Sequence, residues 1–173
     1  GSGCRGLRGT GMYGERAGAY WSGMLSTGVH ALAMEGALGV IRATARVLSA
    51  VAMPPQCQPY SRQAALAHLV KHRVILLAGG TGNPFFTTDS AAALRAAEIG
   101  ADALFKGTQV DGVYSADPKK DPNATRFERI SHAEVIKRGL SIMDTAAIAL
   151  ARENNIPIIV YSIHEKGGFG DIL

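Results

Sequence analysis

A glycine-rich loop placed directly after an apolar strand is the feature that most restricts how this chain can fold. Residues 73–78 are continuously apolar after Arg73, which is typical of a strand buried on both faces of a parallel sheet. Residues 79–84, Gly-Gly-Thr-Gly-Asn-Pro, follow at once and suit no regular element. The alanine-rich segment 90–99 then predicts a helix that ends at Gly100. We therefore expect a strand, a loop and a helix in direct succession.

Hydrophobic periodicity predicts further helices and strands that alternate along the chain. Eight of the 21 glycines fall in the first 24 residues, which are expected to form a loop. Helices are expected from about Leu25, over 61–71, from 131 and around 143–150, and strands over 46–51, 102–106 and 157–162, with a hairpin within 110–117. Ser131 and Glu134 have the spacing of a capping box. This alternation indicates an α/β fold with a parallel sheet covered on both sides, in one domain over 1–173.

Composition excludes several classes of protein. Hydrophobic residues make up 47% of the 173 and charged residues 18%, which is too apolar for a disordered chain. No apolar run approaches the roughly 20 residues that span a bilayer. With only Cys4 and Cys57, a disulfide scaffold is excluded and a cytoplasmic location is favoured. The net charge of +4 is dispersed, which disfavours a nucleic-acid-binding arm and suits either a solvated surface or an anionic substrate.

The glycine loop is also the best candidate for a binding site. Ligands of open α/β sheets bind beyond the carboxyl ends of the strands, where this loop begins. Glycines let backbone N–H groups approach an anion, and a helix N-terminus adds partial positive charge. Thr81, Asn83, Thr87 and Thr88 add polar side chains. The pattern suits a phosphate or a sugar, and the alternative is an ordinary strand-to-helix turn capped by Thr88 or Asp89.

Two segments resemble the motifs of a known family. Residues 80–92, Gly-Thr-Gly-Asn-Pro-Phe-Phe-Thr-Thr-Asp-Ser-Ala-Ala, resemble the nucleoside-monophosphate signature of bacterial uridylate (UMP) kinases. Residues 111–118, Asp-Gly-Val-Tyr-Ser-Ala-Asp-Pro, resemble the ATP-side signature of the wider amino acid kinase superfamily. The resemblance extends from about Arg5 to Ile163. It implies a three-layer α/β/α sandwich around a mainly parallel sheet, and transfer of the γ-phosphoryl group of ATP to UMP with Mg²⁺.

The resemblance implies a role for individual residues. UMP would be bound by Thr81, Gly82, Asn83, Pro84, Phe85, Phe86, Thr87 and Thr88. ATP would be bound by Gly3, Lys106, Thr108, Tyr114 and Asp117. Catalysis would involve Arg5, Asp89 beside Mg²⁺, and Asp144, which helps to order the family's lysine. Each role has an alternative: Asp89 and Asp144 as helix caps, Tyr114 as a hairpin core residue and Lys106 as a surface charge.

The resemblance also implies partners, and the chain departs from the family's pattern in several places. Members are homo-oligomers, commonly hexamers, so the helix near Leu25 is a candidate contact and GTP and UTP are candidate effectors. No nucleic-acid or membrane partner is expected. The family's Lys-x-Ser-Gly strand is missing, which leads us to expect shortened ends. Tyr20 replaces the Asp that reads the ribose hydroxyls. Glu35 and Gly39 replace an arginine and a histidine of the GTP site, while Arg46 is kept. The alternative function is a non-catalytic nucleotide- or anion-binding assembly protein on the same fold.

Overall fold

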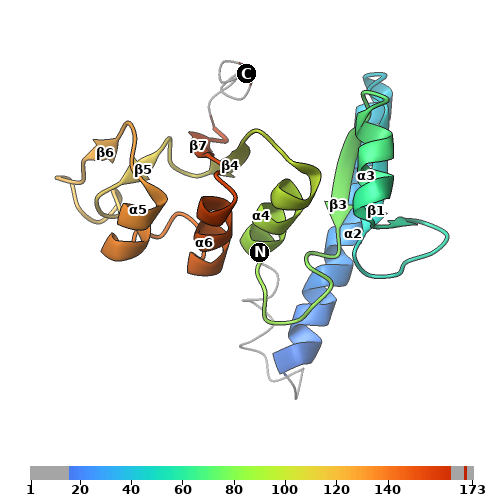
Figure 1. The fold of residues 1–173 in the computed structure, drawn as a ribbon, viewed down its shortest axis with the longest axis horizontal. Coiled ribbons are helices and arrows are strands. Elements are labelled where there is room, and N and C mark those ends of the chain that lie inside the picture. The colour runs from blue at the N-terminus through green and yellow to red at the C-terminus, as the bar shows by residue number, and fades with distance from the viewer. Residues whose placement is uncertain (1–15, 165–169, 171–173) are drawn as a thin grey trace. The chain divides into compact units, whose positions relative to one another are not determined.

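The chain divides into two compact units, Gly1–Ala91 and Ala92–Leu173. The computed structural model describes residues 16–164 and residue 170 (Figure 1). Among these residues, three of the four strand pairings are parallel, as the alternation of helices and strands predicts. None of the helices in this described part is both long enough and apolar enough to cross a membrane.

The first unit is built on a three-stranded parallel sheet. Its elements are α2 (Arg16–Val40), β1 (Ala45–Ser49), β2 (Gln58–Pro59), α3 (Arg62–Leu69), β3 (Val74–Ala78) and the start of α4 (Thr88–Ile99). The strand order is β2-β1-β3, so β1 lies in the middle. Ala45 is opposite Val74 and Ser49 is opposite Ala78, so β1 and β3 end at the same level. Helix α2 packs against both of these strands, and α3 packs against β3.

Two expectations for this unit are wrong. Helix α2 begins at Arg16, so the predicted loop does not extend through residue 24. Burial of Ala19 and Met24 stabilises this part of the helix and opposes the cost of about 1 kcal/mol for each of Gly18 and Gly23. Strand β3 is not buried on both faces, because Val74 and Leu77 are 44% and 38% exposed. In the described part of its sheet, β3 pairs with one strand only, β1.

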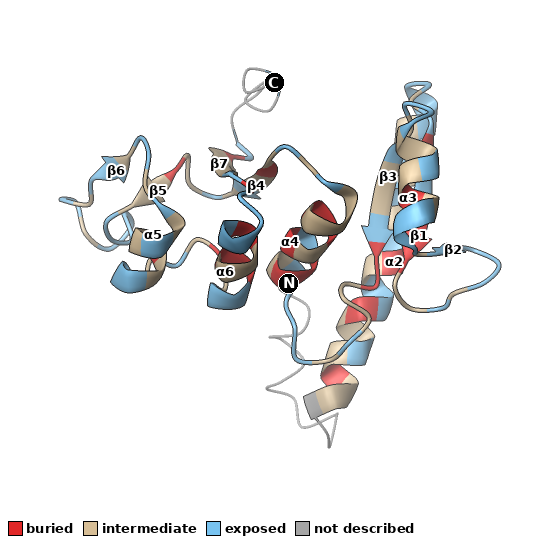
Figure 2. Ribbon diagram, in the orientation of Figure 1, coloured by how far each residue is buried: buried red, intermediate tan, exposed pale blue. Residues whose placement is uncertain are grey.

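The core of the first unit is centred on strand β1, where four of the five residues are buried (Figure 2). Leu48 of β1 is completely buried. Val47, Cys57 and Ala78 form a buried cluster, against which Ala31, Met53 and Leu76 pack. Burial, with a smaller effect of Glu35, raises the pKa of the Cys57 thiol. Cys57 is therefore a core residue whose environment disfavours the thiolate form.

The second unit contains a parallel strand pair and a short antiparallel pair. Its elements after α4 are β4 (Leu104–Thr108), β5 (Val113–Tyr114), β6 (Arg126–Phe127), α5 (His132–Arg138), α6 (Thr145–Glu153) and β7 (Ile158–Ser162). Strand β4 pairs in parallel with β7, and β5 pairs antiparallel with β6. The buried core joins α4, β4, α5 and α6 and comprises Ala93, Ala96, Leu104, Val135, Met143, Ala147, Ile148, Ala151 and Ile156.

The sequence signals at the start of α5 are confirmed, whereas one predicted hairpin and two predicted boundaries are corrected. Ser131 Oγ accepts the Glu134 amide hydrogen bond at 3.2 Å, as the capping-box spacing predicts. The predicted hairpin within 110–117 does not form, because β5 pairs with the more distant β6. Strand β4 begins at Leu104 instead of 102, and α6 begins at Thr145, after Met143.

Replacing Leu48 by alanine tests the importance of the central strand. Because this side chain is completely buried, Leu48→Ala should lower the free energy of unfolding by about 2–5 kcal/mol in denaturant titrations. Val70→Ala is the control, since Val70 is 75% exposed at the end of α3 and should change stability by less than about 0.5 kcal/mol. Equal effects of the two substitutions would contradict this core.

Candidate functional site

The loop between β3 and α4 lies against the end of β1, and glycine makes this close approach possible. Gly79 has φ +77°, and a Cβ there would lie 2.8 Å from Val51 N and 3.1 Å from Ser49 Oγ. Gly82 has φ +79°, and its Cβ would lie 3.1 Å from Ala50 O. The positive φ disfavours a side chain at both positions, the space at Gly79 excludes one, and the space at Gly82 is tight. The loop is placed beyond the carboxyl ends of two adjacent parallel strands, where α/β folds bind ligands.

Short hydrogen bonds hold the loop in one conformation. Gly82 N donates to Gly79 O at 2.9 Å, and Asn83 N donates to Thr81 Oγ1 at 3.1 Å. From helix α2, Thr27 Oγ1 accepts the hydrogen bond of Gly79 N at 2.8 Å. Sequence reasoning missed Thr27, since nothing in the sequence links residues that are 52 positions apart. Thr81 and Asn83 are thus partners of each other, which orders the loop before any ligand arrives.

The loop ends in a capped helix N-terminus. Thr87 Oγ1 accepts hydrogen bonds from the amides of Asp89 and Ser90, both at 3.2 Å. The predicted cap at Thr88 or Asp89 is therefore wrong by one or two residues, because both lie inside α4. The three-residue spacing of Thr87 and Ser90 is the sequence pattern from which the cap at Thr87 could have been predicted. Asp89 lies in the first turn, where the helix dipole favours a carboxylate.

Two aromatic side chains of the loop are exposed, and one has an unusual backbone. Phe85 and Phe86 are 60% and 54% exposed. Phe85 has φ +71°, a left-handed conformation that is rare for a bulky residue and costs about 1–3 kcal/mol. The ring centroid of Tyr20, from helix α2, lies 5.2 Å from the ring centroid of Phe85, and the interplanar angle is 48°. This geometry is an attractive tilted arrangement of aromatic rings.

The residues expected to bind ATP lie on neighbouring elements of the second unit. Lys106 and Thr108 are on β4 and Tyr114 is on β5, and all three are half-buried. Asp117 lies after β5, where its Oδ1 accepts the Lys119 amide at 3.0 Å. Lys106 is opposite Val160 of β7 in the parallel pair. These four positions therefore fall within one short segment between β4 and the turn after β5.

Tyr114 belongs to a polar network centred on Asp111. Its hydroxyl donates to Asp111 Oδ1 at 2.7 Å, and Arg126 NH2 donates to Asp111 O at 2.9 Å. The hydrogen bond from Tyr114 holds the pKa of the Asp111 carboxyl below its ordinary 3.8, with a smaller effect of Arg126. The same hydrogen bond raises the pKa of Tyr114. Sequence reasoning missed Asp111 as a site residue. Its three-residue spacing from Tyr114 was the pattern that could have indicated the hydrogen bond between them.

Of the remaining predicted site residues, Asp144 caps a helix, and the other two lie outside the described residues. Asp144 Oδ1 accepts the Ala147 amide at 2.8 Å and caps α6, the alternative role noted for it. Gly3 and Arg5 fall outside the described residues, so their predicted roles remain predictions.

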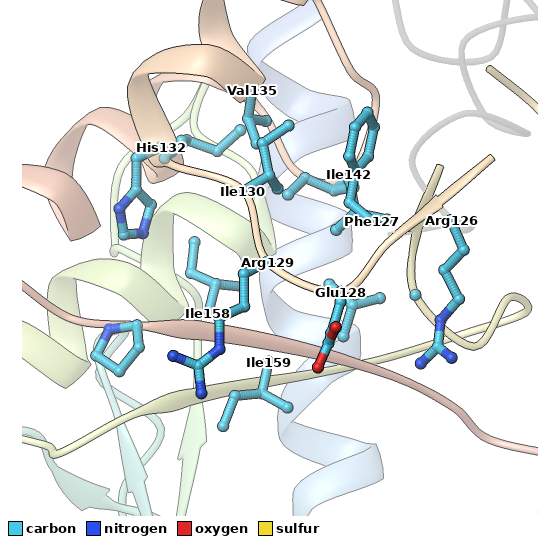
Figure 3. A pocket seen from close by; sticks show the side chains of 15 residues that line it. Arg126, Phe127, Glu128, Arg129, Ile130, His132, Val135, Ile142, Ile158 and Ile159 are labelled. Atoms are coloured by element: carbon cyan, nitrogen blue, oxygen red, sulfur yellow. The ribbon is translucent and has the colours of Figure 1, made fainter. Parts of the chain in front are cut away.

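The second unit also contains a cavity of about 560 Å³ (Figure 3). Its apolar lining includes Ile130, Val135 and Ile142, which face Ile158 and Ile159 of β7 in the close-up view. The charged and polar lining residues are Arg126, Glu128, Arg129 and His132. Of the described residues expected to bind ATP, namely Lys106, Thr108, Tyr114 and Asp117, none lines this cavity, although Gly112 and Val113 of the same motif do.

A smaller cavity of about 380 Å³ in the first unit is lined by the positions that the sequence resemblance assigned to a GTP site. Glu35, Gly39, Arg42 and Arg46 line it. Arg46 NH1 lies 3.7 Å from Glu35 Oε1, so the retained arginine faces a carboxylate of this chain. This ion pair reduces the positive charge that an anionic effector would meet.

Comparison with known proteins agrees with the motifs. The model of the amino acid kinase family matches residues 12–162. Uridylate kinases of Mesorhizobium japonicum and Agrobacterium fabrum are 74% and 63% identical over 92% of this chain, which covers 67% and 66% of their lengths. The UMP kinase structure of Ureaplasma parvum aligns with 99% of this chain and 72% of its own, with a TM-score of 0.90 and 36% identity.

The chain belongs to the amino acid kinase family. The α/β fold with mainly parallel strands and the resemblance to uridylate kinases are thereby confirmed. The chain spans about two thirds of the length of the curated relatives that it matches.

One carboxylate near α4 suits the Mg²⁺ that the sequence resemblance implies. Among the described residues, no group of three His, Cys, Asp or Glu side chains could form an all-protein metal site. Mg²⁺ in kinases is instead held by one or two carboxylates together with substrate phosphates. Asp89, half-buried in the first turn of α4, supplies a suitable carboxylate next to the loop.

Alanine at Gly79 tests the close approach of the loop to β1. Gly79→Ala should destabilise the protein more than Gly80→Ala in denaturant titrations, although both glycines have positive φ. Gly80→Ala should cost only the strain of about 1–2 kcal/mol, since its Cβ would meet nothing closer than Met24 Cγ at 3.7 Å. Gly79→Ala adds a backbone clash worth about 1–3 kcal/mol. Equal losses of stability would show that the loop does not lie against residues 49–51.

Removal of the Tyr114 hydroxyl tests the network around Asp111. A carboxyl group whose pKa is depressed in the folded state stabilises the protein above its unfolded pKa, and this contribution is lost as the pH falls through its folded pKa. Tyr114→Phe should therefore reduce stability at neutral pH, and the difference from the parent should shrink below pH 3.8. Denaturant titrations across this range measure the difference. A difference that is constant with pH, or that grows in acid, would contradict the network.

Proposed function

We propose that this protein transfers the γ-phosphoryl group of ATP to UMP and releases UDP and ADP. The observation that carries the proposal is the ordered loop 79–87, which presents the uridylate kinase signature at the start of α4. The curated relatives named uridylate kinase support the same substrate, since they are 62–74% identical to this chain. Binding by the nucleotide alone, without phosphoryl transfer, is the less favoured alternative.

The acceptor nucleotide would bind at the loop and the N-terminus of α4. Backbone N–H groups and the helix dipole suit its phosphate, and the exposed Phe85 and Phe86 offer ring faces to its base. In the reaction, an oxygen of the UMP phosphate forms a bond to the γ-phosphorus of ATP while the bond to the β,γ-bridging oxygen breaks. ADP leaves with that oxygen, and no covalent enzyme intermediate is required. The protein's contribution is in-line placement of the two phosphates.

The donor nucleotide would be bound by the second group of predicted residues. In this proposal Lys106 and Thr108 meet the phosphates of ATP, and Tyr114 and Asp117 bind the adenosine part. Arg5 and Gly3 retain their predicted roles near the phosphates, and Asp144 retains its predicted role of helping to order the family's lysine. Mg²⁺, held by Asp89, would neutralise charge on the phosphates. Because Tyr114 is already fixed by Asp111, its ring is oriented before ATP binds.

The setting of the reaction forms part of the proposal. We propose a homo-oligomer, up to a hexamer, in the cytoplasm, with GTP and UTP as effectors. Helix α2 carries exposed apolar side chains that support its predicted part in such a contact, namely Trp21, Leu25, Val29, Leu32 and Met34. The Glu35–Arg46 ion pair argues for a weak response to GTP.

Neutralising Asp89 tests the kinase assignment. In a coupled assay of ADP release from MgATP, the intact protein should use UMP in preference to CMP or AMP. Asp89→Asn should lower kcat by about a hundredfold, since one electrostatic contact to the transferred group contributes about that much. The assay also gives the acceptor specificity directly.

The matched control is Asp102→Asn, an exposed aspartate between α4 and β4 that has no proposed role. It should leave kcat unchanged. No ADP release with any nucleoside monophosphate would overturn the proposed function. Full activity of Asp89→Asn would limit Asp89 to stabilising the first turn of α4.

A further inference from the structure

We propose that Tyr20 is a positioning residue of the acceptor site. Its ring holds Phe85, and through Phe85 the loop 80–87, in the conformation that receives a pyrimidine nucleotide. The inference deepens the proposed function and rests on it. It concerns a residue of helix α2 that lies 65 positions before Phe85 in the sequence and belongs to neither signature motif.

The first observation is the strained backbone of Phe85. Its φ of +71° is unfavourable for a side chain of this size, and such conformations persist only where the surroundings enforce them. Hydrophobic burial does not enforce this one, because the Phe85 side chain is 60% exposed. The tilted contact with the Tyr20 ring, at 5.2 Å, is a specific interaction available in this conformation.

The second observation is that one face of α2 contacts the loop at several points along its length. Tyr20, Met24 and Thr27 are spaced by four and three residues, so they project from the same side of the helix. Thr27 accepts the hydrogen bond of Gly79 N, and Met24 is the nearest side chain to the Cβ position of Gly80. Tyr20 extends this row to Phe85. The helix therefore contacts the loop near its beginning and again at its aromatic pair.

The third observation is that the contact leaves ring surface open. Tyr20 is half-buried and Phe85 exposed, so the pair is not part of the core cluster of the first unit. An interplanar angle of 48° leaves the two rings with different orientations. An exposed ring fixed in this way is suited to contact the flat face of a pyrimidine, because little freedom is lost on binding. Loss of Tyr20 would release Phe85 and weaken acceptor binding.

The test separates acceptor binding from turnover in the intact protein. Tyr20→Ala should raise the KM for UMP, and the Kd measured by calorimetric titration with UMP, about two- to tenfold, the range expected for one aromatic contact. The kcat should stay within about twofold and the KM for ATP should not change. Tyr20→Phe keeps the ring and should restore the parent values. His30→Ala, which removes an exposed ring from the same helix, is the matched control and should have no effect.

A second substitution shows whether Tyr20 acts through Phe85. Phe85→Gly removes the ring and accepts positive φ without strain. In this background Tyr20→Ala should have no further effect on the Kd for UMP. An undiminished effect would overturn the inference, as would an unchanged Kd and KM in Tyr20→Ala alone. If Tyr20→Ala lacks a cooperative thermal transition, Tyr20→Leu, which keeps the bulk without the aromatic ring, decides by the same criteria.

The two proposals fail in different ways. If the parent protein releases no ADP with UMP and does not bind it, the proposed function is overturned, and the inference falls with it. If the parent protein is active and Tyr20→Ala matches it in both Kd and KM, only the inference is overturned.

Discussion

The close approach of Gly79 and Gly82 to residues 49–51 is the contact on which the candidate site depends. It brings the loop after β3 over the end of β1, leaving no space for a side chain at Gly79 and little at Gly82. Thr27 fixes the same loop from helix α2. Three segments that are far apart in the sequence are thereby joined at the carboxyl ends of two parallel strands. The N-terminus of α4 follows from this arrangement, since the loop ends at the Thr87 cap.

This arrangement explains how a small number of polar side chains suffices for nucleotide chemistry. Phosphoryl transfer depends on positioning and charge neutralisation more than on covalent help from the protein. The hydrogen bonds between Thr81 and Asn83, and those at Thr87, order the loop at little further cost on binding. Among the residues predicted to bind ATP, Tyr114 is held in position by its hydrogen bond to Asp111. In both units, therefore, side chains next to the predicted binding residues hold the site in place.

Much of the fold could be predicted from local sequence patterns, and the errors have identifiable causes. The capping box at Ser131 and the Gly100 helix end depend on neighbouring residues only, so the sequence contains the whole signal. The start of α2 could not be predicted, because burial of Ala19 and Met24 offsets the helix-breaking tendency of the glycines. The predicted hairpin within 110–117 is wrong because β5 pairs with β6 across a loop of eleven residues, Ser115 to Thr125. The residues of the glycine loop were predicted from their motif, whereas Thr27 and Tyr20 contact the loop across long sequence separations that no local pattern reveals.

The central claim is that the loop 79–89 receives the acceptor nucleotide, and amide chemical shifts test it most directly. Titration of the isotope-labelled intact protein with UMP should shift the backbone amides of residues 79–89 and those of the neighbouring residues 49–51. Amides that line the cavity of the second unit, such as Ile158 and Ile159, should shift little. Shifts confined to that cavity, with an unchanged loop, would contradict the account.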